Sequence, residues 1–382
     1  MKIVVVGGGM AGLTYSIAAA RWGNKVVLCE RNKRVGRKVA MSGNGKCNVG
    51  NLNADGKFYN APDFVNDVFA RVPTANYLEF LRSVGIYTYA DEQGRLYPVT
   101  DSASSVVDCF RAEAERLGVQ TLTESQAVAI DVGDGFVVRL SDGRKIACDK
   151  AVVACGSKSQ ADETALAELV GKQYLTPCVP SLTPVRVKNA DGTLNGVRNR
   201  AKVTLLRDGK PVADEFGEVQ FKDYGLSGVC VFNLSALIAR DIARGCKHDY
   251  VLAVDVCPDI DEQTLTDIIR QRIAEGKQDY LLGLVKNRVA EYVVKKVKNC
   301  TLKDIPERAA NTVKNMAFIF EKLLDYSMSQ VTAGGVDLKF VDKQTLSLSN
   351  GVTVVGEALD VDGVCGGFNL QFAACSALSL FV

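Results

Sequence analysis

The sequence predicts an α/β fold built on a parallel β-sheet, with a β-rich segment and then a helical segment inserted before the sheet is completed. Two observations carry this prediction. The chain opens on the apolar run Ile3–Val6, followed at once by the glycine-rich residues 7–12. It closes on a second, shorter apolar segment, Val354–Val355, followed by glycines at 356, 363, 366 and 367. Apolar runs of this kind are typical of strands buried on both faces of a parallel sheet.

The opening glycines have the spacing of a Rossmann-like dinucleotide-binding loop. Gly7, Gly9 and Gly12 fit G-x-G-x-x-G between the predicted strand and a helix of small apolar residues. The first glycine permits a tight turn, the second lets backbone approach a phosphate, and the third lets the helix pack closely on the strand. The free N–H groups and the positive dipole of the helix N-terminus favour a pyrophosphate there.

A second strand and a terminal acid strengthen this interpretation. Residues 25–29 predict another buried strand, and Glu30 closes it about 20 residues after the glycines, where a carboxylate accepts ribose hydroxyls. Strand, glycines, helix, strand and acid thus occur in order within about thirty residues, which is far more specific than a lone glycine motif. An acid at position 30 argues against a 2′-phosphate but does not separate FAD from NAD.

The next segment, residues 34–48, is basic and rich in glycine. It is too polar for a core strand. Its cations and backbone N–H groups are suited to wrap a phosphate-bearing ligand, and an ordinary surface loop is the alternative. The candidate residues are Arg37, Lys38, Ser42, Gly43 and Gly45.

The rest of the first domain alternates helices and strands. Residues 62–84 and 103–118 have helical apolar spacing, and Phe136–Leu140 with Lys145–Cys148 predict a hairpin. Residues 151–155 predict a buried strand that ends on Gly156, where backbone can again approach a cofactor.

The character of the sequence changes near residue 180 and again near Pro258. Residues 202–206, 217–221 and 229–234 predict short strands of a small β domain. Asp261 is the expected N-cap of a helix, and further helical patterns follow through residues 313–324. After Ser329 short strands and glycine loops return, so the first domain is predicted to be discontinuous.

Composition narrows the function classes. A formal net charge of +2 points to neither nucleic acid nor an anionic membrane. No run of 18 apolar residues predicts a membrane span, and the N-terminus leads directly into a core strand, so we expect no signal peptide. The twelve cysteines contain no C-x-x-C spacing, and several lie in apolar runs. We therefore expect a reduced, cytoplasmic protein without a metal site.

The single histidine, His248, lies in a polar segment typical of a surface turn. A Ser-His-Asp triad or a multi-histidine metal centre is therefore disfavoured. We expect a cofactor to carry the chemistry.

The ordered motifs resemble those of the BaiN/RdsA-type (YhiN-like) bacterial FAD-dependent oxidoreductases. The similarity covers nearly the whole chain, and the Cys-Asn and late Gly-Gly-Phe-Asn segments are its more specific parts. Many members carry Gly-Arg-Cys-Asn where this chain has Lys46 in place of arginine, which removes a planar, bidentate donor. The matching segments are residues 7–12, Glu30, 36–38, 42–48, 94–98, 224–228, 332–336, 356–363 and 366–371.

This resemblance implies a discontinuous FAD domain with a β-barrel-like insertion and a helical insertion nested within that. Together with the composition shifts, it predicts an FAD domain at 1–180 and 327–382, a barrel-like domain at 181–257 and a helical domain at 258–326.

The resemblance also implies roles for individual residues. Glu30 is expected to hold the adenosine ribose, and Lys38 and residues 42–48 are expected to lie along FAD. Gly356, Glu357 and Asp360 are expected near the ribityl chain and pyrophosphate, and residues 366–370 are expected to offer backbone N–H groups to the isoalloxazine. The predicted cofactor residues are Gly7, Gly9, Met10, Ala11, Gly12, Glu30, Arg31, Lys38, Ser42, Gly43, Asn44, Cys47, Asn48, Val128, Gly156, Gly356, Glu357, Asp360, Gly366, Gly367, Phe368, Asn369 and Leu370.

The leading functional hypothesis is hydride transfer through flavin N5 to a small or medium apolar substrate, an enone being one option, with NAD(P)H as reductant. No second G-x-G-x-x-G follows a suitable strand, so NAD(P)H would visit the substrate cavity transiently. Reduction of an enone also needs a proton donor. Tyr224 is the main candidate and Cys47 the weaker one, with structural packing as the alternative for each.

Two other hypotheses remain open. One is a flavin-dependent oxidase that uses oxygen. The other is a non-turnover flavoprotein that binds RNA or a protein through its helical insertion, although the near-neutral charge opposes it. Its support is the group Lys286, Arg288, Lys295, Lys296 and Lys298, for which a solvated helix face is the simpler interpretation.

Overall fold

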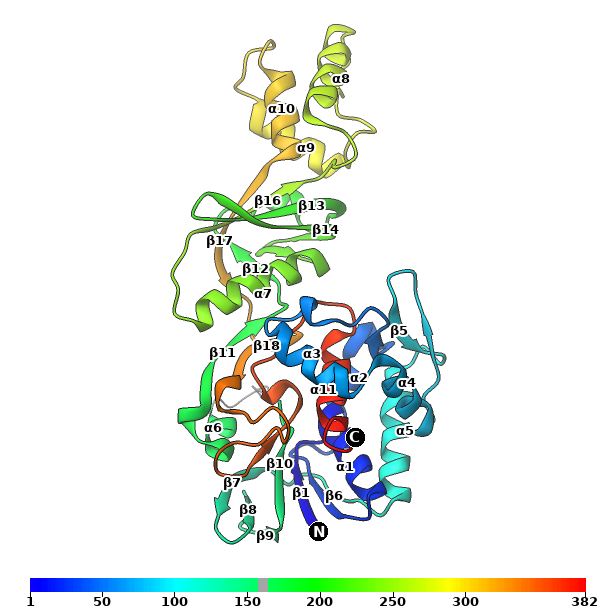
Figure 1. The fold of residues 1–382 in the computed structure, drawn as a ribbon. Helices are drawn as coiled ribbons and strands as arrows, with labels where there is room; N and C mark the ends of the chain where they lie inside the picture. Colours follow the sequence, from blue (N-terminus) through cyan, green and yellow to red (C-terminus); the bar gives the residue numbers. More distant parts are fainter. Residues whose placement is uncertain (157–163) are drawn as a thin grey trace. The chain divides into compact units, whose positions relative to one another are not determined.

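A computed structural model describes residues 1–156 and 164–382, which form two compact units (Figure 1). Unit 1 comprises Met1–Val179 and Val331–Val382, and unit 2 comprises Pro180–Gln330. The predicted fold class is confirmed: a Rossmann-like α/β core formed by both ends of the chain, and an inserted β-barrel that carries helices.

A parallel sheet forms the centre of unit 1. Among the described residues its strand order is β19-β10-β1-β2-β6, and every neighbouring pair is parallel. Val4, Val5 and Val152 are fully buried, as expected for strands covered on both faces. The strands are β1 (Lys2–Val6), β2 (Lys25–Cys29), β6 (Gln120–Leu122), β10 (Lys150–Val153) and β19 (Thr353–Val354).

Two helices from opposite ends of the sequence, α1 (Met10–Arg21) and α11 (Phe368–Leu378), pack against each other. Near their N-terminal halves Gly356 is wedged between them, since a Cβ on Gly356 would lie 2.6 Å from Ala11 Cβ and 3.6 Å from Ala373 Cβ. Farther along, the ring of Tyr15 lies 5.0 Å from that of Phe381. The helices therefore run parallel, and because Ala11 aligns with Ala373, α11 begins about 6 Å ahead of α1.

The remainder of unit 1 surrounds this core. The predicted hairpin is confirmed as β8 and β9, and the predicted helix over 62–84 is two helices because Pro73 interrupts it. The elements are α2 (Arg37–Ala40), β3 (Gly50–Asn51), α3 (Pro62–Arg71), α4 (Thr74–Ser83), β4 (Thr88–Ala90), β5 (Arg95–Pro98), α5 (Ala103–Arg116), β7 (Ala127–Val132), β8 (Phe136–Leu140), β9 (Lys145–Cys148), α6 (Thr164–Val170), β11 (Leu175–Ser181) and β18 (Val331–Val336).

Unit 2 contains a closed barrel with the order β12-β15-β14-β13-β16-β17 among the described residues. Val185, Val203, Leu226 and Leu252 are fully buried on its inner side. The strands are β12 (Val185–Val187), β13 (Arg198–Arg207), β14 (Lys210–Lys222), β15 (Gly225–Ser227), β16 (Tyr250–Asp255) and β17 (Met316–Leu323).

Two predictions in unit 2 are wrong. The predicted strand 229–234 is the start of helix α7 (Val229–Ala243), since a short apolar run does not distinguish a strand from a buried helix. The helical pattern over 313–324 ends at Lys314, and the rest is strand β17, in which Met316 and Phe318 are buried and Ala317 is exposed. Alternation with period two is the signature of a strand with one buried face.

Three helices connect β16 to β17: α8 (Glu262–Ala274), α9 (Asn287–Val297) and α10 (Ile305–Lys314). The predicted N-cap is confirmed, because the Asp261 carboxylate accepts the Thr264 backbone N–H at 2.9 Å. Across residues 1–156 and 164–382, no helix combines the length and apolar character needed to cross a membrane.

Gly12→Ala is expected to destabilise the protein by about 1–3 kcal/mol, because the added methyl would lie 1.9 Å from the Gly7 carbonyl oxygen. Gly9→Ala is the matched control, since its added methyl would have no atom within 4 Å and its φ of −83° suits alanine. Urea unfolding of the two apoproteins measures the difference. An equal decrease in the free energy of unfolding in both variants would contradict the close packing at Gly12.

Candidate cofactor site

The N-terminus of α1 is open to an anion. Gly9 is the N-cap residue of this helix, and no side chain caps it. The backbone N–H groups of Met10, Ala11 and Gly12 precede the first intrahelical bond, which Leu13 donates to Gly9 at 2.9 Å. A Cβ at Gly9 would meet nothing within 4 Å, so there is room for a phosphate beside these donors.

Glu30 is held rigidly beside this loop. Its side chain is buried, and Oε2 accepts the Gly8 N–H at 2.8 Å. Its other oxygen accepts the backbone N–H of Asn32 at 2.8 Å and the Asn32 side-chain amide at 2.5 Å. A carboxylate has about four acceptor positions, so capacity remains for a ribose hydroxyl. Asn32 is not among the residues predicted from the sequence, although its position two residues after an acid is typical of a local side-chain bond.

The late segment 356–360 meets the early basic loop. Lys38 forms an ion pair with Glu357 at 2.8 Å, and Glu357 also accepts the backbone N–H of Thr332 at 3.0 Å. Gly156 lies beside the same carboxylate, since its Cβ position is 3.6 Å from Glu357 Oε2. Asp360 accepts the Gly334 N–H at 3.1 Å. These predicted residues from three distant parts of the sequence therefore lie together.

The N-terminus of α11 is a second open helix end. Gly367 is its N-cap, with φ +92°, and no side chain caps the helix. With the Asn48 amide oriented to satisfy its neighbours, its oxygen accepts the Gly367 N–H at 3.1 Å and its nitrogen donates to the Gly50 carbonyl at 2.8 Å. A Cβ at Gly367 would lie 2.2 Å from that carbonyl oxygen, so only glycine permits this contact.

Aromatic and amide groups fix the start of α11. The Phe368 ring stacks on Phe58 with centroids 4.6 Å apart, and the Phe368 carbonyl accepts the Tyr59 hydroxyl at 2.7 Å. The Asn369 side chain accepts the Gly363 N–H at 2.8 Å and donates back to its carbonyl at 2.9 Å. Leu370 follows, half-buried. These contacts therefore hold the backbone N–H groups of the first turn of α11 in fixed positions.

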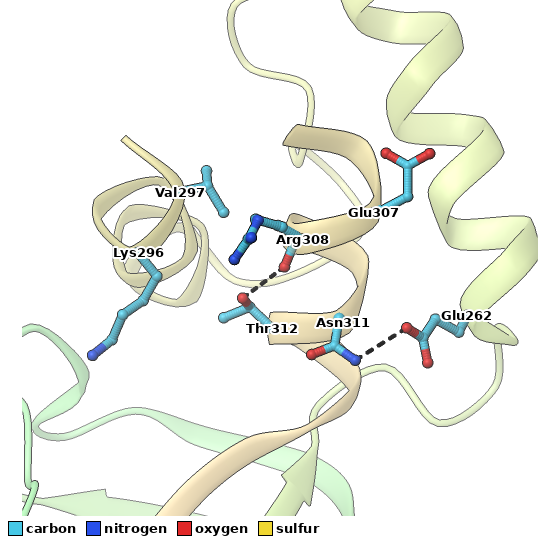
Figure 2. A pocket seen from close by; sticks show the side chains of 7 residues that line it. All are labelled: Glu262, Lys296, Val297, Glu307, Arg308, Asn311 and Thr312. Carbon is cyan, nitrogen blue, oxygen red and sulfur yellow. Dashed lines mark hydrogen bonds between the residues drawn. The ribbon is translucent and has the colours of Figure 1, made fainter. Parts of the chain in front are cut away.

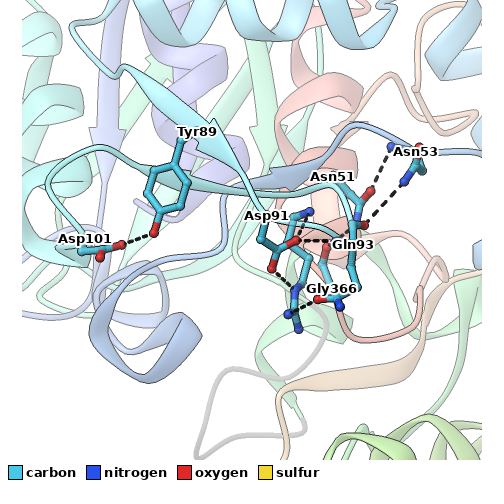
Figure 3. A network of polar contacts seen from close by, with 8 residues as sticks. Asn51, Asn53, Tyr89, Asp91, Gln93, Asp101 and Gly366 are labelled. Carbon is cyan, nitrogen blue, oxygen red and sulfur yellow. Dashed lines mark hydrogen bonds and ion pairs between the residues drawn. The ribbon is translucent and has the colours of Figure 1, made fainter. Parts of the chain in front are cut away.

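Asn51 links this loop to the rest of unit 1 (Figure 3). Its buried amide donates to the Gly366 carbonyl at 3.1 Å, and its backbone N–H donates to Gln371 Oε1 at 2.7 Å. Its oxygen accepts the Asn53 N–H at 2.9 Å. Neither Asn51 nor Gln371 is among the residues predicted from the sequence. Gln371 carries a usable sequence signal, because it is a polar residue inside an apolar helix, and the structure shows that it is fully buried.

The remaining predicted cofactor residues lie in unit 1. Gly43 and Asn44 have left-handed φ values of 58° and 53° in the tight turn that begins at Ser42. Arg31 is half-buried and directly follows Glu30. Val128 is skipped in the pairing of β7 with β8, where Ala127 and Ala129 pair with successive residues, so its backbone is left out of the ladder.

The two candidate proton donors have different surroundings. Cys47 in unit 1 is fully buried, and burial raises the pKa of its thiol to about 11. Tyr224 lies in unit 2, in the turn between β14 and β15, and is half-buried. Burial raises the pKa of Tyr224, Asp223 adds to the rise, and a bond from Ser227 and the charge of Arg186 oppose it.

A hollow of about 440 Å³ lies between the helices of unit 2 (Figure 2). It contains none of the predicted cofactor residues. Hydrogen bonds within its wall, such as that from Asn311 to Glu262 at 3.2 Å, occupy part of its polar surface. It is lined by Glu262, Lys296, Val297, Glu307, Arg308, Asn311 and Thr312.

Comparison with protein families gives a match along residues 1–380 to the family described as HI0933-like protein Rossmann domain. The chain belongs to this family. The predicted resemblance is thereby confirmed, and the protein is an FAD-dependent oxidoreductase.

Two sequence relatives and one solved structure are similar to this chain. The 3-dehydro-bile acid delta(4,6)-reductase of Clostridium scindens is 30% identical, over 97% of this chain and 96% of its own. A ribosomal RNA dihydrouridine synthase of Escherichia coli is 26% identical, over 98% and 95% respectively. Among solved structures, a 3-ketosteroid-delta4-(5alpha)-dehydrogenase of Rhodococcus jostii is 15% identical, covers 99% of this chain and 96% of its own, and has a TM-score of 0.46.

Glu30→Gln is expected to weaken FAD binding about tenfold, because the neutral amide accepts ribose hydroxyls less strongly and turns an N–H₂ group toward Gly8 or Asn32. Glu115→Gln, on the exposed face of α5, makes the same charge change away from the glycine loops. Fluorescence titration of the apoproteins with FAD gives both dissociation constants. An unchanged value for Glu30→Gln would remove Glu30 from the site.

Proposed function

We propose that this flavoprotein uses NAD(P)H to reduce a carbon–carbon double bond conjugated to a carbonyl in a small or medium apolar substrate. The observation that carries the proposal is 30% identity over 97% of the chain to a protein named as a Δ4,6-reductase. Bound FAD supplies hydride transfer through its N5 atom.

The residues of unit 1 fit FAD as follows. The open N-terminus of α1 would hold the pyrophosphate, and Glu30 would hold the adenosine ribose. The N–H groups at the start of α11 would face the isoalloxazine, where donors fixed by rigid backbone stabilise negative charge. The start of α11 is suited to a reducible cofactor because these N–H donors need no rearrangement when negative charge develops on the ring.

The names of the relatives point to a reaction class rather than to one substrate. A Δ4,6-reductase saturates double bonds, and a dihydrouridine is a uridine whose ring double bond, conjugated to a carbonyl, has been saturated. Both products therefore arise by reduction of a conjugated alkene. The greater identity to the bile acid enzyme favours a small-molecule substrate for this chain.

The cations of α9 and of its N-cap residue, Lys286, also favour a small molecule over RNA. Lys286 and Arg288 donate to the backbone carbonyls of Arg198 and Asn195, and Lys295 pairs with Asp191 at 3.1 Å. These three side chains stabilise contacts within unit 2, so the basic group that supported an RNA-binding role is largely engaged. Phosphate binding needs cations that can leave such contacts.

Enone reduction also requires a proton at the carbon next to the carbonyl. Tyr224 is the proposed donor, since it is half-buried and keeps its hydroxyl proton at neutral pH. Cys47 is less suited because its thiol is fully buried.

A cytoplasmic location forms part of the proposal. All twelve cysteines are free, including the exposed Cys246. Unpaired thiols in this number suit a reducing compartment.

The test follows the two half-reactions anaerobically. NADH or NADPH should bleach the flavin absorbance of the holoprotein, and a steroid 4-en-3-one should restore it. The Tyr224→Phe variant should keep the first step and slow the second at least 100-fold, since a lost general acid costs that much.

Three outcomes would contradict the proposal. A flavin that stays oxidised when NADH and NADPH are added would exclude NAD(P)H as the reductant. A flavin absorbance that oxygen restores and the steroid does not would favour an oxidase. Restoration by a uridine-containing ribosomal RNA fragment but not by the steroid would exclude the small-molecule substrate.

A further inference from the structure

One row of side chains on the barrel of unit 2 is strongly cationic. In the strand registers Arg186 pairs with Gly225 on one side and with Lys322 on the other, and Gly225 pairs in turn with Lys222. Residues directly opposite each other in a sheet share a face, and neighbouring strands are about 4.8 Å apart. Arg186 on β12 and Lys322 on β17 therefore stand on neighbouring strands, and Lys222 on β14 lies two strands from Arg186, across Gly225 on β15.

This row faces away from the barrel interior. Val185 and Val187, the neighbours of Arg186 along β12, are buried, whereas Lys322 is exposed and Arg186 and Lys222 are half-buried. Residues on alternating positions of a strand lie on opposite faces. The cations thus lie on the outer face, where a ligand can reach them.

Arg186 lacks the partners that a half-buried guanidinium normally has. Its Nε is buried and has no hydrogen-bond partner, and within residues 1–156 and 164–382 no carboxylate lies within ion-pair distance of Arg186, Lys222 or Lys322. Other arginines of the same barrel are paired, as Arg200 is with Asp259 at 2.8 Å. A buried polar atom without a partner calls for an explanation, and an oxyanion is the group that a guanidinium binds best.

Hydroxyl groups complete the cluster. Tyr224 and Ser227 belong to the same turn and strand as Gly225, and the Tyr224 carbonyl accepts the Val187 N–H at 3.0 Å, which fixes the turn against β12. Arg186 is close enough to Tyr224 to oppose the rise in its pKa. Two exposed acids adjoin the row in sequence, Asp223 next to Lys222 and Glu321 next to Lys322.

We propose that Arg186, flanked by Lys222 and Lys322, is the centre of a binding site for the carboxylate or phosphate group of a ligand. The planar guanidinium offers two parallel N–H donors to such a group, and the two ammonium groups add attraction without competing for the same geometry. The two sources of this chemistry are a substrate that carries a carboxylate and a nucleotide that carries a terminal phosphate. The site lies within unit 2 and does not depend on the proposed reaction.

The experiment measures binding to the FAD-loaded protein by calorimetry, with cholate as the carboxylate probe and 2′,5′-ADP as the phosphate probe. One of the two should bind, and the one that binds identifies the source. Arg186→Gln should weaken that binding about tenfold or more, and Arg186→Lys should retain part of it. Arg200→Gln is the control, because it removes the same charge from a paired, exposed arginine of the barrel.

Thermal unfolding of each variant, together with its flavin absorbance, establishes that the variants are folded. Failure of the wild-type protein to bind either probe would overturn the proposal. Equal affinity of the wild-type and Arg186→Gln proteins would overturn it as well, since the binding would then arise elsewhere. Either result is independent of whether an enone is reduced.

Discussion

The parallel packing of α1 against α11 is the constraint on which the rest of unit 1 depends. It is possible because Gly356 lies between Ala11 and Ala373 with no room for a larger residue. The hydroxyl of Ser376, which lies on α11, accepts the Gly356 N–H at 2.9 Å and fixes Gly356 between the two helices. Two helix N-termini, with their positive dipole ends, thereby open in the same direction but are offset along the helix axis. An extended dinucleotide with charge at two separate points suits that arrangement.

The loops before the two helices differ in what they require. At α1 the loop must be small, so glycines occupy the positions where backbone packs on backbone. At α11 the loop must be rigid, and residues 48–51 supply the rigidity through Asn48 and Asn51. These two amides can do this because each donates and accepts at once. Residues nearly the full length of the chain apart thus meet in unit 1, where we propose that FAD binds.

Local patterns predicted the parts of this structure that depend on local physics. The glycine loop, Glu30, the hairpin and the Asp261 cap all follow from turn chemistry, burial or capping within a few residues. Val229–Leu234 and Met316–Leu323 were predicted wrongly because an isolated apolar run does not reveal whether the barrel or a helix will cover it. Gln371 was missed although a polar residue inside an apolar helix marks it, and Asn51 was missed because its role arises only when distant segments meet. Arg186 was missed for the same reason, since its cationic neighbours come from other strands.

The most direct test of this account is a crystal structure of the protein with FAD bound. The account predicts the pyrophosphate within hydrogen-bond distance of the N–H groups of residues 10–12, and a ribose hydroxyl on Glu30. It also predicts the isoalloxazine ring against the N–H groups at the start of α11. A flavin bound away from the α11 N-terminus would contradict the central claim that two offset helix ends hold the cofactor.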